Sequence, residues 1–162
     1  GIAAVERGAS FIRDELARIG VGLDVVRLEA GAVFVQMRKG DYDAIFHRLL
    51  FSGTDPAVSL DFWLSSGGSH VWNPSQPKPA TDWEKQIDEL MRQQVATRDH
   101  SERAPLFREV QRVFNEHLPI INFAAPRLYV ATSARLANAT PARLRPQLLW
   151  NPDTLAVNRS GQ

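Results

Sequence analysis

The chain has 162 residues, with 19 Lys and Arg against 18 Asp and Glu, so its formal net charge is +1. Hydrophobic residues make up 44% of the chain, which excludes the disordered and collagen-like classes. There is no cysteine, which excludes disulfides and thiolate metal sites.

Further classes of protein are disfavoured by how the residues are distributed. The arginines are scattered among carboxylates, which argues against a nucleic-acid partner. No apolar run reaches the roughly 18 to 20 residues that a bilayer span requires, and residues 1–20 show no export signal. A chain of this length can bury a core of its own, so we expect residues 1–162 to form a single α/β domain.

The first part of the chain predicts two helix–strand units. Apolar residues recur near the helical period over residues 5–19, and Gly20 suits the left-handed position that ends a helix. Residues 21–28 alternate in polarity and favour a strand, residues 32–39 return to helical spacing, and residues 44–51 predict a second strand, buried on both faces. A helix between two strands implies a parallel pair with a right-handed crossover.

The remainder predicts further helices around one long irregular segment. Asp55 is the expected N-cap of a helix that runs to about Leu64. Residues 65–81 predict an irregular connection, which is either functional or docked on something outside this chain. Helices are predicted over 82–96, after a Thr81–Glu84 capping box, and over 99–117. Strands are then expected over 120–123 and 128–132.

No residue pattern of catalysis or metal binding stands out. The four histidines, His47, His70, His100 and His117, lack the spacing of a helical zinc site. Ser52-Gly53 lacks the glycine pattern of a serine-hydrolase elbow, and no glycine-rich phosphate loop is present. We therefore expect no catalytic residue, no metal and no cofactor, and a protein that is not an enzyme. A small hydrolase would require a histidine within hydrogen-bond reach of a serine.

The stretch from Leu49 to Pro56, where a strand is expected to give way to a helix, is the best candidate for a binding site. Ligands of open α/β sheets bind beyond the carboxyl ends of the strands, and free N–H groups at a helix start can hold a polar group. An ordinary turn with an Asp cap explains the same residues. Trp63 and Trp72 flank the long segment. Three roles fit them: the wall of a pocket, an anchor for a missing neighbour, or part of the core.

Read in order, several short motifs resemble the C-terminal lobe of the extracellular solute-binding proteins, family 5, of ABC transporters, which is the peptide, nickel and oligopeptide class. The resemblance spans nearly all of the chain. The motifs that carry it are Glu15-Leu16-Ala17-Arg18-Ile19-Gly20-Val21, Gly40-Asp41-Tyr42-Asp43-Ala44, Thr54-Asp55-Pro56, Ile87-Asp88-Glu89-Leu90, Thr97-Arg98-Asp99, Arg103, Leu106-Phe107, Val110-Gln111, His117-Leu118-Pro119-Ile120-Ile121, Leu148-Leu149-Trp150-Asn151 and Leu155-Ala156-Val157.

The resemblance implies one lobe of a type II periplasmic-binding-protein-like fold, with a mixed sheet flanked by helices. It further implies a missing N-terminal lobe that closes on this one around a solute, a membrane permease as partner, and a periplasmic or extracellular location, with membrane association through the transporter or a lipid anchor. Apolar surface should be exposed along the cleft. In peptide receptors of the family, an Asp in the strand-to-helix loop pairs with the peptide α-ammonium, three residues after a Trp. Ser52 aligns with that Asp and Leu49 with that Trp.

The predicted function is thus the binding of a peptide or another small polar solute between two lobes. A neutral serine hydroxyl cannot replace the ion pair to an α-ammonium, so sugars and modified peptides are equally admissible. The expected ligand-binding residues are Phe51, Ser52, Thr54, Asp55, Trp72 and Asn73. The alternative is a protein-interaction module, in which the apolar stripes of residues 82–117 dock a partner.

Overall fold

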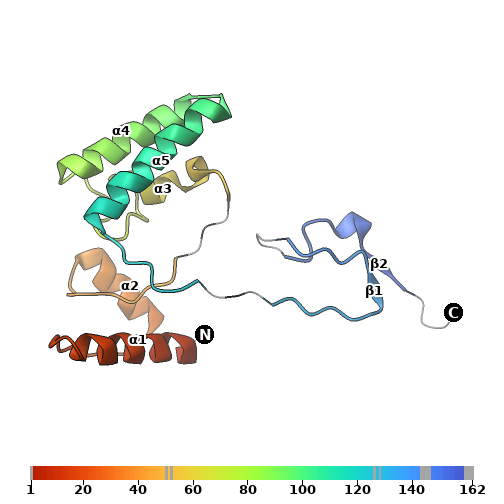
Figure 1. Cartoon of the computed structure of the whole chain (residues 1–162), viewed down its shortest axis with the longest axis horizontal. Helices are drawn as coiled ribbons and strands as arrows, with labels where there is room; N and C mark the ends of the chain where they lie inside the picture. The colour runs from red at the N-terminus through yellow and green to blue at the C-terminus, as the bar shows by residue number, and fades with distance from the viewer. Residues whose placement is uncertain are drawn as a thin grey trace.

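The computed structural model describes residues 2–49, 51, 53–125, 127, 129–142 and 147–158. Its helices are α1 (Ile2–Ala17), α2 (Ala30–Lys39), α3 (Leu60–Trp63), α4 (Asp82–Ala96) and α5 (His100–His117), with short 3-10 helices η1 (Pro56–Ser59) and η2 (Pro152–Thr154). Its strands are β1 (Leu136–Ala137) and β2 (Ala156–Val157). Figure 1 shows α4 and α5 side by side with α3 next to them, α1 and α2 below, and the two strands at the opposite end of the molecule. None of the helices in the described ranges combines the length and the apolar character that a membrane crossing needs.

The helix ends lie close to where the local signals predict them. Gly20 and Gly40 adopt positive φ angles of 85° and 66°, as expected for glycines that terminate α1 and α2. Thr81 and Glu84 form the predicted capping box at the start of α4, and the Asp99 side chain caps α5. The turn expected after Asp55 is a 3-10 helix that continues into the single turn of α3.

The core lies between α4, α5 and α3. Its buried members are Phe62, Ile87, Met91, Val110, Val113 and Phe114. These residues recur at helical spacing on α4 and α5, so the two apolar stripes face each other. Val110 and Phe114 are buried, and Phe107 is packed against the core. The alternative of an interaction module therefore loses its docking stripe, because the protein's own helices already cover it.

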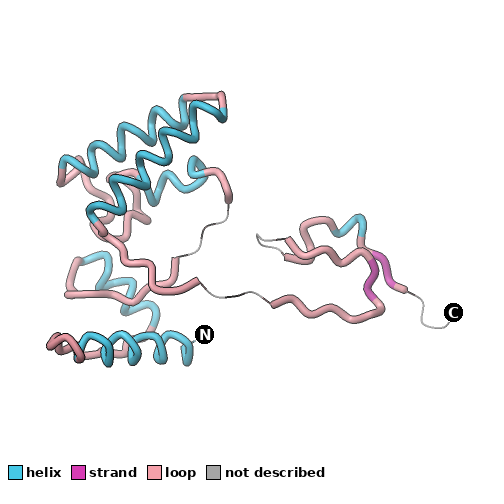
Figure 2. Tube along the Cα trace, viewed as in Figure 1, coloured by secondary structure: helices cyan, strands magenta, loops and turns pink. Residues whose placement is uncertain are grey.

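The strands expected over 21–28, 44–51 and 120–123 are absent, which corrects the prediction of a parallel pair (Figure 2). Residues 22–28 and 42–49 make no backbone–backbone hydrogen bond with any other described residue. Residues 129–132 are not a strand either, and Leu50 and Leu128, which belong to predicted strands, lie outside the described residues. Alternating polarity shows only that a segment can have two faces. A strand also needs a neighbouring backbone, which the described chain does not supply here.

The sheet that does form is small and antiparallel. β1 pairs with β2 in a register that sets Leu136 opposite Val157 and Ala137 opposite Ala156. The mixed sheet expected from the family resemblance is therefore wrong for the described part of the chain, which contains helices and this two-stranded sheet. Within the motif Leu155-Ala156-Val157, the last two residues form β2.

Helix α1 packs on two of the segments that were expected to be strands. A Cβ atom on Gly8 would lie 3.0 Å from the ring of Phe46 and 3.4 Å from that of Phe123, so the small residue permits this close approach. Many large apolar side chains nevertheless stay open to solvent, among them Val26, Ile121 and Tyr129. The accessible surface of the chain is 12410 Å², against roughly 8,000 Å² for a compact domain of this size. Large apolar side chains are thus exposed, while the expectation that they line a cleft stays a prediction.

Candidate functional site

The loop expected to bind a solute is partly open to solvent. Phe51 is 49% exposed and packs edge-on against Phe62, with the ring centroids 5.1 Å apart. Thr54 is exposed, and Asp55 is half-buried. Ser52 lies outside the described residues. The open position of Thr54 is compatible with contact to a solute, because its hydroxyl can both donate and accept a hydrogen bond.

Asp55 is engaged inside the protein. Its Oδ1 accepts the N–H of Ala57 at 2.9 Å, which caps η1, and also a hydrogen bond from Nη2 of Arg103 at 2.7 Å. The Ala57 N–H and the Arg103 guanidinium hold the pKa of this carboxyl below its usual value. Because the negative charge of Asp55 is paired with Arg103, the loop does not present it freely to a cationic group of a solute.

Arg103 connects the loop to the helix pair. It lies in the first part of α5, and its Nε donates to the carbonyl oxygen of Gln94 on α4 at 3.1 Å. Gln94 is 2% exposed, and its Oε1 has no hydrogen-bond partner among the described residues. One guanidinium thus links the loop, the end of α4 and the start of α5.

The long segment 65–81 is docked on α4, and two carboxylates hold it there. Asp88 accepts hydrogen bonds from the backbone N–H of Ser65 at 2.8 Å and from its hydroxyl at 3.1 Å. Glu84, one turn earlier on α4, accepts from Nε2 of Gln76 at 2.9 Å and from Nε1 of Trp72 at 3.1 Å. Both carboxylates are 2% exposed. This corrects the expectation of docking on something outside this chain, because the segment is docked on α4 of the chain itself.

Trp72 and Asn73 are the two residues of this segment that were expected to bind a ligand, and they lie in different surroundings. The Trp72 ring packs within 5.5 Å of the rings of Phe62 and Phe114, so most of its surface belongs to the core. Asn73 is exposed, and its carbonyl oxygen accepts from the Gln76 side chain at 3.0 Å. Trp72, Asn73 and Thr54 line neither of the two hollows of the described structure.

Sequence reasoning missed Glu84, Asp88 and Arg103 as organising residues. A signal for two of them was present, because positions 84 and 88 share the face of α4 that carries Ile87 and Met91. Carboxylates on a helix are usually solvated, so this position was not enough to predict their burial. Their partners in residues 65–76 are 8 to 23 residues away in the sequence and come close only in the folded chain.

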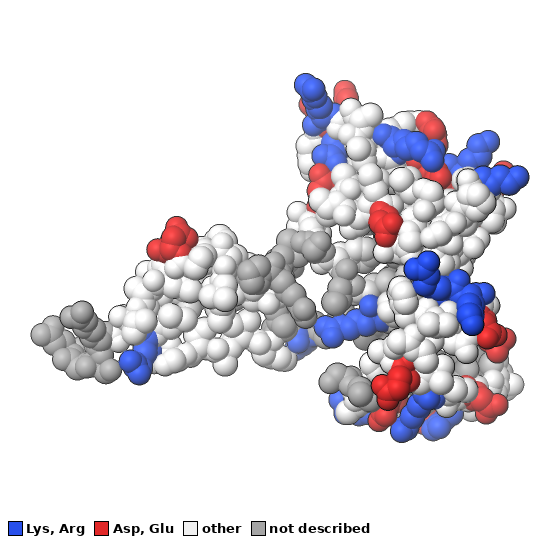
Figure 3. Space-filling model, turned by 180° about the vertical axis from the view of Figure 1, so that it is seen from behind, with Lys and Arg blue, Asp and Glu red and all other residues white. Residues whose placement is uncertain are grey.

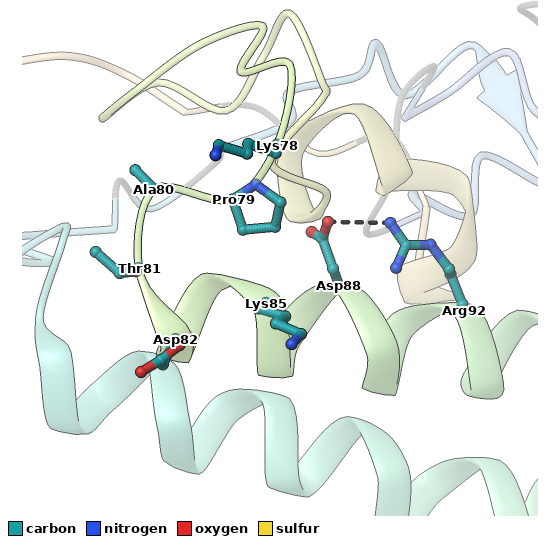
Figure 4. A pocket seen from close by; sticks show the side chains of 8 residues that line it. All are labelled: Lys78, Pro79, Ala80, Thr81, Asp82, Lys85, Asp88 and Arg92. Carbon is teal, nitrogen blue, oxygen red and sulfur yellow. Dashed lines mark hydrogen bonds and ion pairs between the residues drawn. The ribbon is translucent and has the colours of Figure 1, made fainter.

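A hollow of about 580 Å³ opens beside the docked segment (Figure 4). Residues 78–82 form one side, and three side chains of α4 form the other. Its lining residues are Lys78, Pro79, Ala80, Thr81, Asp82, Lys85, Asp88 and Arg92. Arg92 donates to Asp88 at 3.1 Å, so one of the cations is already paired. A second hollow of about 550 Å³ lies on α1, and neither is lined by the loop at 51–55.

Charge gives no indication of a large polyanionic partner on the face drawn in Figure 3. Lys and Arg alternate with Asp and Glu over the helical part. In the ranges that the structure describes, no cluster of three or more His, Cys, Asp or Glu side chains could hold a metal ion. A small hydrolase would need a histidine next to a serine hydroxyl. The buried His70 contacts Glu84 instead.

Comparison with known proteins identifies relatives among solute-binding proteins. Di/tripeptide-binding protein 2 of Pseudomonas aeruginosa is 26% identical over 140 residues, which is 86% of this chain and 25% of that protein. Di/tripeptide-binding protein 4 of the same species is 30% identical over 75% of this chain and 22% of its own length. The glutathione-binding protein GsiB of Shigella dysenteriae is 22% identical over 83% of this chain and 27% of its own length.

These relatives confirm the resemblance seen in the short motifs. The chain is thus related to the ABC-transporter solute-binding proteins, family 5. It spans about a quarter of the length of the curated relatives it matches. No family model matches the chain, and no solved structure matches it.

Proposed function

We propose that this chain is the C-terminal lobe of a non-enzymatic solute receptor that binds a small polar solute between two lobes and delivers it to an ABC permease. The observation that carries the proposal is the match of 75–86% of the chain to relatives named for binding di- and tripeptides and glutathione. The proposal includes a periplasmic or extracellular location, with attachment to the membrane through the transporter or a lipid anchor.

The loop at 51–55, with Phe51, Ser52, Thr54 and Asp55, is the proposed ligand surface. The exposed positions of Phe51 and Thr54 support this assignment. The pairing of Asp55 with Arg103 leaves the loop with hydroxyl groups in place of a free charge. Such a surface recognises neutral polar groups better than an unpaired ammonium. Trp72 and Asn73 stay in the proposal as a side wall that the other lobe completes.

The exposed apolar side chains support a second lobe as partner. Val26, Ile121 and Tyr129 are each at least 75% exposed. Contiguous apolar surface of this kind is typical of an interface, and these side chains are candidates for one. In the proposed receptor, the part of the protein outside this chain covers such residues and supplies the opposite wall of the cleft.

The experiment that tests the proposal is calorimetric titration of the full-length protein with di- and tripeptides, with glutathione and with a disaccharide of similar size. We expect saturable binding of at least one of these solutes and no turnover of it. No binding to any of them, or conversion of a solute to product, would refute the proposed function.

A substitution tests the loop assignment separately. Ser52→Asp places a carboxylate where peptide receptors of the family carry one, so we expect tighter binding of peptides with a free α-ammonium than the unmodified protein shows. The control is Asn115→Asp, which adds the same charge on an exposed position of α5. Equal affinities for the two variants would show that residue 52 does not face the solute.

A further inference from the structure

His70 occupies an unusual position at the centre of the docked segment. Its side chain is 1% exposed, and both of its ring nitrogens contact oxygen atoms. Nδ1 lies 3.0 Å from the carbonyl oxygen of Phe62, and Nε2 lies 3.3 Å from Oε1 of Glu84. The His70 ring also packs against Trp72, with the ring centroids 3.8 Å apart.

These contacts determine which form of the ring fits. A backbone carbonyl can only accept a hydrogen bond, so Nδ1 must carry a proton to satisfy the Phe62 oxygen. An ionised carboxylate also only accepts, so Nε2 must carry a second proton. Only the positively charged imidazolium has both. In the neutral ring, one nitrogen would turn a lone pair toward an acceptor inside a buried site, which is unfavourable.

Glu84 is the ionised partner that this arrangement requires. Burial by itself raises the pKa of its carboxyl, but hydrogen bonds from Gln76, Thr81, His70 and Trp72 outweigh burial and lower it. The other oxygen, Oε2, accepts the backbone N–H and the hydroxyl of Thr81 at 2.9 and 2.8 Å. One carboxylate thus collects donors from His70 to Thr81, over the larger part of the segment.

We propose that His70 and Glu84 form a pH-sensitive latch that holds residues 65–81 on α4 while the imidazole is protonated and loosens them when the ring loses its proton. At high pH, one nitrogen turns a lone pair toward either the Phe62 carbonyl oxygen or the Glu84 oxygen that also accepts from Trp72 and Gln76, and that contact becomes repulsive. At low pH, the stabilisation from Glu84 is present above its ordinary value of 4.5 and is lost as pH falls through its lowered pKa. The latch is closed between these limits.

Other titratable groups also lie around the segment, on α3, α4 and α5. On α3, the Asp61 carboxylate accepts the N–H groups of Gly68 and Ser69 at 2.8 and 2.9 Å. On α4, Asp88 is bonded to Ser65 and Arg92. On α5, His117 is exposed and stacks on Trp83 with the centroids 5.1 Å apart. The exposed charges nearest to the segment are Lys78, Asp82 and Lys85.

The first test is made by nuclear magnetic resonance on the full-length protein without ligand, between about pH 5 and about pH 9. We expect the nitrogen shifts of His70 to report two N–H groups at the lower end and one at the upper end. Over the same step, we expect the hydrogen-exchange protection of the Trp72 indole N–H to fall about tenfold, after correction for intrinsic exchange. A neutral His70 throughout, or protection that does not follow its titration, would overturn the proposal.

Two variants provide the second test. His70→Gln removes the charge that titrates, so the protection of the Trp72 indole should become independent of pH across the step, while His117→Gln should leave the wild-type pH profile intact. A His70→Gln protein that keeps the wild-type profile would contradict the latch. Because no solute is used, failure of these tests and failure of the proposed binding function are distinguishable.

Discussion

Arg103 and Asp55 lie 48 positions apart in the sequence and are joined by a hydrogen bond of 2.7 Å between Nη2 and Oδ1. The same Asp55 oxygen accepts the N–H of Ala57 and so begins η1. The position of the proposed ligand loop is therefore set by α5, through one arginine side chain that is only 22% exposed.

Arg103→Met removes the pair but keeps a long apolar stem, so we expect a lower unfolding temperature and faster amide exchange at residues 53–57. The control is Arg108→Met, because Arg108 is an exposed arginine on the same helix. Thermal unfolding followed by circular dichroism, with hydrogen exchange, measures both effects. If the two variants behave alike, the pair does not hold the loop.

The hydrogen-bonded pair of Asp55 and Arg103 also predicts that the stability of the protein depends on pH. The pKa of Asp55 is lowered by the Ala57 N–H and by Arg103, so its contribution to stability is present above its ordinary value of 3.8 and is lost as pH falls through the lower folded value. The difference in unfolding temperature between wild type and Arg103→Met should therefore shrink between about pH 6 and about pH 3. A difference that stays constant over this range would show that Asp55 is not the partner that matters.

Gly67 lies where the docked segment crosses α3. A Cβ atom at this position would collide with the backbone carbonyl oxygen of Asp61, whereas at Gly68 the nearest atom is 3.9 Å away. Gly67→Ala should therefore lower the free energy of unfolding by about 1 to 3 kcal/mol, and Gly68→Ala should change it much less. Urea unfolding measures both, and equal losses would refute the close approach.

Leu118 ends α5 in the left-handed conformation, with φ of 44°. A residue with a Cβ atom is strained there by roughly 1 kcal/mol, and glycine is not. We expect Leu118→Gly to be more stable than Leu118→Ala by about this amount, in contrast to the usual order of the two residues. Both variants remove the same exposed side chain, so their difference isolates the backbone. An alanine variant of higher stability would contradict the strain.

Met91 packs at the centre of the helix pair and has no exposed surface. Truncation leaves a cavity between α4 and α5, so Met91→Ala should lower the free energy of unfolding by about 2 to 5 kcal/mol. Val95→Ala, one turn later on an exposed position, should change it by less than about 0.5 kcal/mol. Similar losses in urea unfolding would show that the core does not lie where the structure has it.

The helices of this protein follow from signals that lie within a few residues of each other. The Thr81–Glu84 box, the Asp99 cap and the glycines at 20 and 40 act on backbone groups of their own segment, so they could be recognised without a fold. The apolar stripes of α4 and α5 likewise predict that each helix has a buried face. They do not show which element covers that face. The family resemblance was predictable for the same reason, because it is carried by short local motifs.

The predicted strands are absent because a strand is stabilised by hydrogen bonds to another segment and not by its own residues. Residues 22–28 and 44–49 have the right side chains, but their backbone groups need a neighbour that the described chain does not provide. A pattern of alternation cannot show whether that neighbour exists. The candidate loop was placed correctly as a capped helix start, while its tie to Arg103 depends on a contact between distant segments.

The sequence by itself determined where the helices begin and end, which face of α4 and α5 is apolar, and to which family the chain is related. Only the tertiary structure decided that residues 65–81 dock on α4 and that Trp72 belongs to its core. The physical reason is that a carboxylate such as Glu84 is stable in a buried position only when donors surround it. Those donors come from separate parts of the loop, and folding alone brings them together.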